Sequence, residues 1–132
     1  MSRSVPTAPA WLPLPIDADE GFPQSFRLAL DSGLYRVGLY VNVSEELLQM
    51  LGSQALLELP REDAFLVLRI ARESDAGEPR TIFQRKVVPA LDYRASELTL
   101  RFDELTIARA NLNAPGPHGS TVTGRVASAW AS

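Results

Sequence analysis

The residues that could support catalysis are few in this sequence, and their spacing matches no catalytic pattern. The one histidine, His118, lies in the loop-forming stretch APGPHGS, so a Ser-His-Asp arrangement would have to be built around this loop residue. No serine stands in a nucleophile-elbow pattern, and the sequence contains no HExxH, Walker or GxGxxG motif. The sequence therefore predicts neither an enzyme nor a cofactor or metal site.

Acidic residues are scattered along the chain. Two acids can meet in space and perform glycoside chemistry without being neighbours in sequence, so a paired-acid enzyme stays as a third alternative. The acidic cluster of Asp17, Asp19 and Glu20 lacks the ligand spacing of a calcium loop, and we interpret it as a solvated turn. The chain has no cysteine, which excludes disulfides, thiolate metal ligands and cysteine nucleophiles.

Basic residues gather on two stretches that we expect to pair as strands. Arg69 and Arg72 lie on the first stretch, and Arg80, Arg85 and Lys86 lie on the second. If these strands pair, part of one surface carries positive charge, which suits an acidic protein or nucleic acid. The alternative is a solvent-facing side of a sheet whose charge nearby acids offset. The formal net charge of −3 favours this alternative, and direct nucleic-acid binding is not expected.

Residues 1–24 form a proline-rich N-terminal arm that holds half of the ten prolines in the chain. Proline fixes φ and lacks an amide donor, so the arm is expected to be extended, as polyproline II or as an edge strand. Its apolar residues either pack along their own domain or dock on a neighbouring subunit. The candidate interface residues are these apolar residues, four of the basic residues above and one C-terminal aromatic: Trp11, Leu12, Leu14, Ile16, Arg69, Arg72, Arg85, Lys86 and Trp130.

Residues 25–132 are expected to form a single all-β domain, because alternating patterns recur at short spacing. The strongest pattern covers residues 25–43, where apolar and polar side chains alternate on two arms. It predicts a β-hairpin with a three-residue loop at 31–33. Gly33 is expected to take the left-handed conformation that ends such a loop.

One short helix and further strands follow the hairpin. Ser44 is a good N-cap and Gly52 a good C-cap for a helix between them. Residues 54–59 either extend this helix or begin a strand. Further strands are predicted at 64–72, 81–88, 98–107 and 121–130. The parity of the apolar positions changes at Asp103-Glu104, which predicts a β-bulge or a tight bend.

Six or seven short strands with one helix indicate a small antiparallel β-barrel or sandwich. No apolar run in the sequence is long enough to span a membrane.

Within residues 11–42, a short strand at Leu12-Pro13-Leu14 precedes a polar gap. Then come a strand at Gln24-Ser25-Phe26, a turn at Asp31-Ser32-Gly33, and a strand from Tyr35 to Asn42. This order resembles the opening of small bacteriophage tail-tip proteins of the baseplate plug type. The turn is one residue longer here, and a helix stands where that family continues in strand, so the position within a tail stays open. The resemblance implies a virion component and carries no catalytic residues.

The resemblance favours a structural protein of a phage tail or baseplate. Such a protein binds other tail or baseplate proteins in a homo-oligomeric ring or a hetero-assembly. It resides in the virion and is assembled in the host cytoplasm. The alternative function is a free-standing β-barrel module or adaptor in the cytoplasm that binds a ligand or a protein in a concave apolar pocket.

Overall fold

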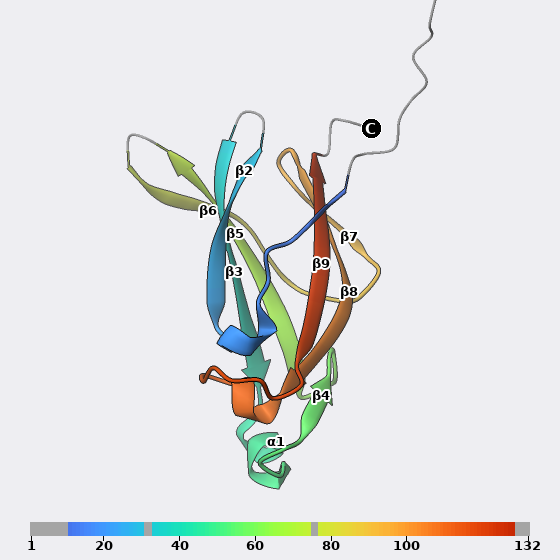
Figure 1. The fold of residues 1–132 in the computed structure, drawn as a ribbon. Helices are drawn as coiled ribbons and strands as arrows, with labels where there is room; N and C mark the ends of the chain where they lie inside the picture. The colour runs from blue at the N-terminus through green and yellow to red at the C-terminus, as the bar shows by residue number, and fades with distance from the viewer. Residues whose placement is uncertain (1–10, 31–32, 75–76, 129–132) are drawn as a thin grey trace, which may run out of the picture.

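The computed structural model describes residues 11–30, 33–74 and 77–128, and the structural statements below concern these ranges. They form two antiparallel sheets that pack face to face as a β-sandwich (Figure 1). The predicted all-β fold with one short helix is confirmed. The described strands form two separate sheets, and they do not close into a barrel.

The first sheet has five strands and the second has four. The order of the first is β1 (Leu12–Pro13), β9 (Thr121–Ser128), β8 (Leu98–Ala108) and β4 (Leu56–Glu58), with β7 (Asp92–Ala95) also paired to β8. The order of the second is β2 (Gln24–Leu30), β3 (Gly33–Val43), β5 (Ala64–Ser74) and β6 (Gly77–Lys86). The helical elements are α1 (Glu45–Met50) and two 3-10 turns, η1 (Ala18–Glu20) and η2 (Arg109–Asn111).

The hairpin of β2 and β3 confirms the strongest sequence pattern. Tyr35 and Val37 point into the core and are fully buried, whereas Arg36 between them is exposed. Strand pairing continues to Leu30 opposite Gly33. Gly33 therefore belongs to β3, and it has no positive φ. The predicted three-residue loop with a left-handed Gly33 is wrong, because the ladder extends one residue further than the alternation suggested.

The helix α1 forms where its capping signal predicts. The Ser44 side chain accepts a hydrogen bond from the Leu47 backbone N–H at 3.1 Å. Leu47 is the residue of α1 whose side chain is buried. The C-cap is Leu51 in extended conformation, one residue before the predicted Gly52. The next apolar run begins a strand, β4, which pairs with the end of β8. Figure 1 places α1 at the end of the sandwich opposite the β2–β3 and β5–β6 hairpin ends.

Strand β8 is the main strand of the five-stranded sheet. One of its edges pairs with β9, and the other pairs first with β7 and then with β4. Phe102 pairs with Gly124 and Glu104 pairs with Thr123, which leaves Asp103 as an extra residue. This bulge confirms the predicted parity switch. Strand β7 has no counterpart among the predicted strands.

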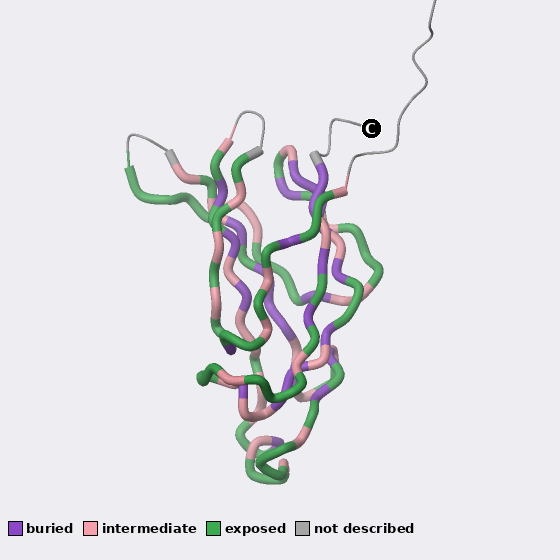
Figure 2. Tube along the Cα trace, viewed as in Figure 1, coloured by how far each residue is buried: buried purple, intermediate pink, exposed green. Residues whose placement is uncertain are grey.

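The core lies between the two sheets. Figure 2 shows the buried residues along the facing strands, while the loops and α1 are largely exposed. Strand β5 lies between β3 and β6, so Leu66, Val67 and Leu68 are all buried, as their continuous apolar run predicts. The largest fully buried side chains come from both sheets: Tyr35, Phe102, Leu39, Leu57, Leu66, Leu68, Ile70, Leu98, Leu100 and Ile107.

Candidate interaction surfaces

The described part of the N-terminal arm begins with β1, a short edge strand of the five-stranded sheet. Leu12 pairs with Val126 of β9, and the Leu14 N–H donates to the Gly124 carbonyl oxygen at 2.8 Å. The Leu14 side chain joins the core and is 7% exposed, whereas Leu12 is 53% exposed. Of these two candidate interface residues, the structure therefore leaves only Leu12 at the surface.

The segment between β1 and β2 is fixed to the same domain. Ile16 is half-buried against the core, and Phe22 is buried. The Phe22 N–H donates to the Asn111 carbonyl oxygen at 2.9 Å. The Gln24 side-chain amide donates to the carbonyl oxygens of Asp17 and Gly21 at 2.8 and 2.9 Å. Of the two arrangements predicted for the arm, the described residues take the one against their own domain.

The Trp11 patch consists of Trp11, Arg101, Arg125, Asp92 and Asp103. Arg101 and Arg125 lie directly opposite each other on β8 and β9. Their guanidinium carbons lie 5.5 and 5.6 Å from the centre of the Trp11 ring, within the range of a cation–π interaction. Trp11 is therefore held by two cations from the sheet on which β1 docks.

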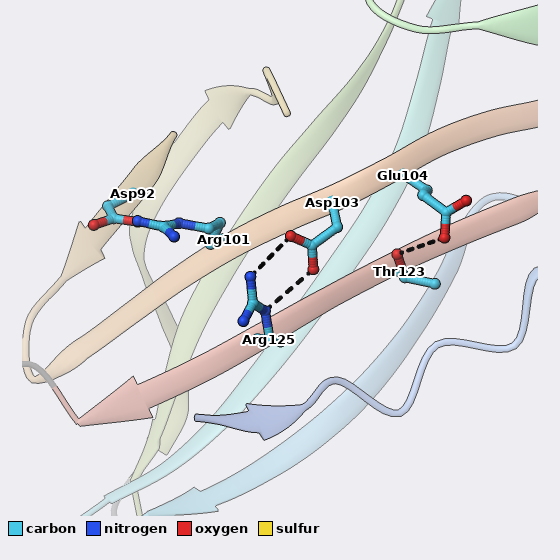
Figure 3. Close-up of polar contacts among 6 residues, drawn as sticks. All are labelled: Asp92, Arg101, Asp103, Glu104, Thr123 and Arg125. Carbon is cyan, nitrogen blue, oxygen red and sulfur yellow. Dashed lines mark hydrogen bonds and ion pairs between the residues drawn. The ribbon is translucent and has the colours of Figure 1, made fainter. Parts of the chain in front are cut away.

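Each arginine of the Trp11 patch has its own aspartate (Figure 3). Arg101 Nε donates to Asp92 Oδ1 at 2.6 Å. Arg125 forms a bidentate contact with Asp103: Nε donates to Oδ2 at 3.2 Å and Nη2 donates to Oδ1 at 3.0 Å. Two arginines directly opposite each other in a sheet would repel, and the aspartates offset this repulsion.

The bulge in β8 supplies the second aspartate. Because Asp103 has no partner on β9, both Asp103 and Glu104 face solvent, and Asp103 reaches Arg125. Glu104 accepts a hydrogen bond from the Thr123 hydroxyl at 3.4 Å. The pKa of Arg101 is raised above its ordinary value, mainly by its hydrogen bond to Asp92 and secondly by the negative charge of Asp92. The patch is therefore a fixed arrangement of charges around one aromatic ring.

The four basic candidate interface residues do not form one patch. Arg69 pairs with Gln84 and Lys86 pairs with Val67, which places both basic residues on the outer face of the four-stranded sheet. Arg85 pairs with the buried Leu68 and therefore has the opposite parity. Arg72 shares that inward parity, and its guanidinium carbon lies 5.8 Å from the centre of the Tyr35 ring. The two strands pair as predicted, but alternation divides the arginines between two faces.

The outer face of the four-stranded sheet instead brings Arg69 near Arg36 of β3. Both line a hollow of about 410 Å³ together with Ser25, Gly38, Ala71, Glu78, Pro79 and Thr81. Sequence reasoning missed Arg36 and the small residues because the order of strands was not known. The alternation within β3 did place Arg36 on the polar face.

The remaining candidates lie at the α1 end of the sandwich or outside the described residues. His118 is exposed and lines an open hollow of about 320 Å³ with Ser53, Gln54, Leu56, Ala108, Ala110 and Pro117. Asn111, which sequence reasoning did not single out, is fully buried and holds this loop together. Its amide donates to the carbonyls of Ala114 and Gly116, and its oxygen accepts from the Ser120 hydroxyl at 2.6 Å. Trp130 lies outside the described residues.

Among residues 11–30, 33–74 and 77–128, no group of three or more histidine and acidic side chains is placed to hold a metal ion. No helix in the same ranges is long and apolar enough to cross a membrane. Comparisons with protein-family models, with curated proteins and with solved structures found no match.

Proposed function

We propose that this protein is a structural component that acts by binding neighbouring protein chains in an oligomeric assembly, of the class found in phage tails and baseplates. The observation that carries the proposal is the Trp11 patch, an aromatic ring that packs against two arginines of the five-stranded sheet. Tryptophan and arginine are the residues most enriched at the energetic centres of protein interfaces. The resemblance of residues 11–42 to baseplate plug proteins supports the tail assignment within this class.

The fixed geometry of the patch favours binding. Immobilising a side chain on association costs about 0.5–1.5 kcal/mol, and a side chain that is ordered beforehand avoids much of this cost. Trp11 is held by Arg101 and Arg125, and these are held by Asp92 and Asp103. A partner surface would therefore meet an aromatic ring already in place, with charged groups around its rim.

Light scattering of the full chain at about 1–100 µM tests self-assembly through this patch, because oligomer mass depends on protomer concentration. We expect the full chain to form a defined oligomer and Trp11→Ala to shift the mass toward the monomer. Met50→Ala is the matched control, since Met50 is a large apolar side chain, 81% exposed, at the α1 end of the sandwich. A full chain that stays monomeric throughout, or a Trp11→Ala variant with unchanged mass, would refute assembly through the patch.

The tail assignment needs a separate test. If the protein belongs to a virion, an antibody raised against it should label purified tail particles assembled in cells that carry its gene. If the antibody labels protein in the cells but not the purified tail particles, this part of the proposal is contradicted. The same outcome would favour the second candidate function, a free-standing protein-binding adaptor, which the open hollow on the four-stranded sheet supports.

A further inference from the structure

The hollow on the outer face of the four-stranded sheet has a floor of small residues. Strand register places Ser25 beside Gly38, and Ala71 beside Thr81, in two adjacent rows across the sheet. Ser25 and Gly38 are the β2 and β3 members of one row, and Ala71 and Thr81 are the β5 and β6 members of the next row on this face. The floor therefore runs diagonally across all four strands. We call this feature the arginine groove, because Arg36 and Arg69 stand on its two sides.

Register also explains why an arginine stands on each side. Arg69 shares the row of Gly38, and Arg36 shares the row of Ala71. Each long side chain is therefore the cross-strand neighbour of a small one. An ideal Cβ built on Gly38 would have the Arg69 carbonyl oxygen, at 4.0 Å, as its nearest contact, so space above this residue is open.

Both arginines keep hydrogen-bond donors for a ligand. Arg69 donates from Nε and Nη2 to the Thr81 hydroxyl at 3.1 and 2.8 Å, which orients its guanidinium and uses two of its five N–H groups. Among the described residues, no carboxylate forms an ion pair with Arg69. Arg36 Nη2 forms an ion pair with Glu73 Oε1 at 3.7 Å, a distance too long for a hydrogen bond, so this contact leaves its N–H donors in place.

Glu73 is engaged mainly by Arg27. Arg27 Nη2 donates to Glu73 Oε1 at 3.2 Å, and Arg27 Nε lies 3.0 Å from Glu73 Oε2, although Oε2 receives no well-aligned hydrogen bond. Arg27 pairs with Arg36, and Lys86 and Arg69 lie on the same outer face. This face therefore has more cationic than anionic groups, although the whole chain has a net charge of −3.

We propose that the arginine groove binds an extended, acidic segment of a partner protein. The basic excess on this face is complementary to carboxylates, and guanidinium groups bind carboxylates through two parallel hydrogen bonds. Neighbouring strands lie about 4.8 Å apart, so the groove spans roughly 14 Å from β2 to β6. About four or five residues of extended chain cover that length.

The lining favours a peptide over nucleic acid. The floor of Ser25, Gly38, Ala71 and Thr81 has no aromatic ring on which a base could stack. Glu78 at the β6 side would repel a carboxylate or a phosphate placed directly beside it, but it can accept a hydrogen bond from a peptide N–H, a donor that the nucleic-acid backbone lacks. The groove lies on the sheet opposite the Trp11 patch, so this inference goes beyond the proposed function and does not depend on it.

The test uses a fluorescein-labelled octapeptide of alternating glutamate and serine, with binding to the full chain followed by fluorescence anisotropy at about 50 and 200 mM salt. We expect saturable binding that weakens at the higher salt. Arg69→Gln should weaken it about tenfold or more, since one charge-assisted contact is lost. Arg36→Gln provides a second variant if Arg69→Gln folds poorly.

Gly38→Val separates a shaped groove from a merely charged surface. The new side chain fills the floor without changing charge, and valine suits a strand, so the variant should remain folded but bind the peptide about tenfold more weakly. Arg85→Gln is the matched control, because it removes the same charge from β6 on the other face. It should bind within about twofold of the unmodified chain.

Four results would overturn the inference. They are an absence of saturable binding, full binding by Gly38→Val, an equal loss in Arg85→Gln and Arg69→Gln, and tighter binding of an oligothymidylate of the same length than of the acidic peptide. Circular dichroism of each variant establishes that it is folded before its binding is compared.

Discussion

Leu14 and Gly124 should be energetically coupled, because they share one space between β1 and β9. An ideal Cβ on Gly124 would lie 2.8 Å from Leu14 Cδ1, 3.0 Å from Phe102 Cδ2 and 3.1 Å from the Arg101 carbonyl oxygen. The first of these contacts is closer than non-bonded carbon atoms approach, so Gly124→Ala forces the Leu14 side chain to move. The absence of a side chain at Gly124 is thus what allows β1 to dock.

The expected magnitudes follow from burial and space. Leu14→Ala removes an almost fully buried side chain at the edge of the core, so we expect a loss of about 2–3 kcal/mol in the free energy of unfolding, the lower end of the usual range. Gly124→Ala overpacks the site and should cost about 1–3 kcal/mol. In the double variant the new methyl enters space that Leu14 has left. Its loss should therefore be smaller than the sum of the two by about 1 kcal/mol or more.

Urea unfolding of the four chains, followed by circular dichroism, measures this coupling. The slopes of the transitions must agree for the free energies to be compared. Leu47→Ala is the matched control partner, since Leu47 is buried under α1 at the far end and should add independently to Gly124→Ala. If Leu14→Ala and Gly124→Ala add within about 0.5 kcal/mol, the claim that Gly124 makes room for β1 is refuted.

Three further predictions concern single side chains. Asn111→Ala should lower the free energy of unfolding by about 2–3 kcal/mol, since three part-buried hydrogen bonds of its amide are lost. Asn42→Ala, at an exposed position, should change the free energy of unfolding little in the same urea assay. Burial and the Glu97 hydrogen bond raise the pKa of Tyr35, so stability should fall as pH rises above about 10, where the unfolded chain loses this proton first. Alkaline unfolding curves of Tyr35→Phe should lack this component, and an unchanged pH dependence would contradict it. Ser44→Ala should cost about 1 kcal/mol by thermal or urea unfolding through loss of the α1 N-cap, and a stable variant would argue against that cap.

The sequence was most informative where one face of a strand is buried and the other is exposed to solvent. Alternation located the β2–β3 hairpin, and the change of parity located the bulge at Asp103. Both signals are local, because they depend on neighbours within a few residues. The short strand β7 was missed because its four residues give too little alternation, and only its pairing with β8 defines it.

The surfaces were harder to predict because they depend on which strands become neighbours. Arg101 and Arg125 are far apart in sequence, and only the register of β8 and β9 brings them together over Trp11. The predicted basic patch was divided between two faces for a local reason. Arg69 and Arg72 are three positions apart on a strand, and side chains at odd spacing point to opposite sides.

The pairing of β1 with β9 also bears on the order in which the chain folds during synthesis. Leu12 pairs with Val126, so residues 12–126 must all leave the ribosome before this contact can form. The four-stranded sheet needs only residues up to Lys86 and can form earlier. Until β9 is made, β1 lacks the strand with which it pairs in the folded domain. During that interval a strand edge offered by another chain would compete with β9, and the outcome would depend on the local concentration of neighbours.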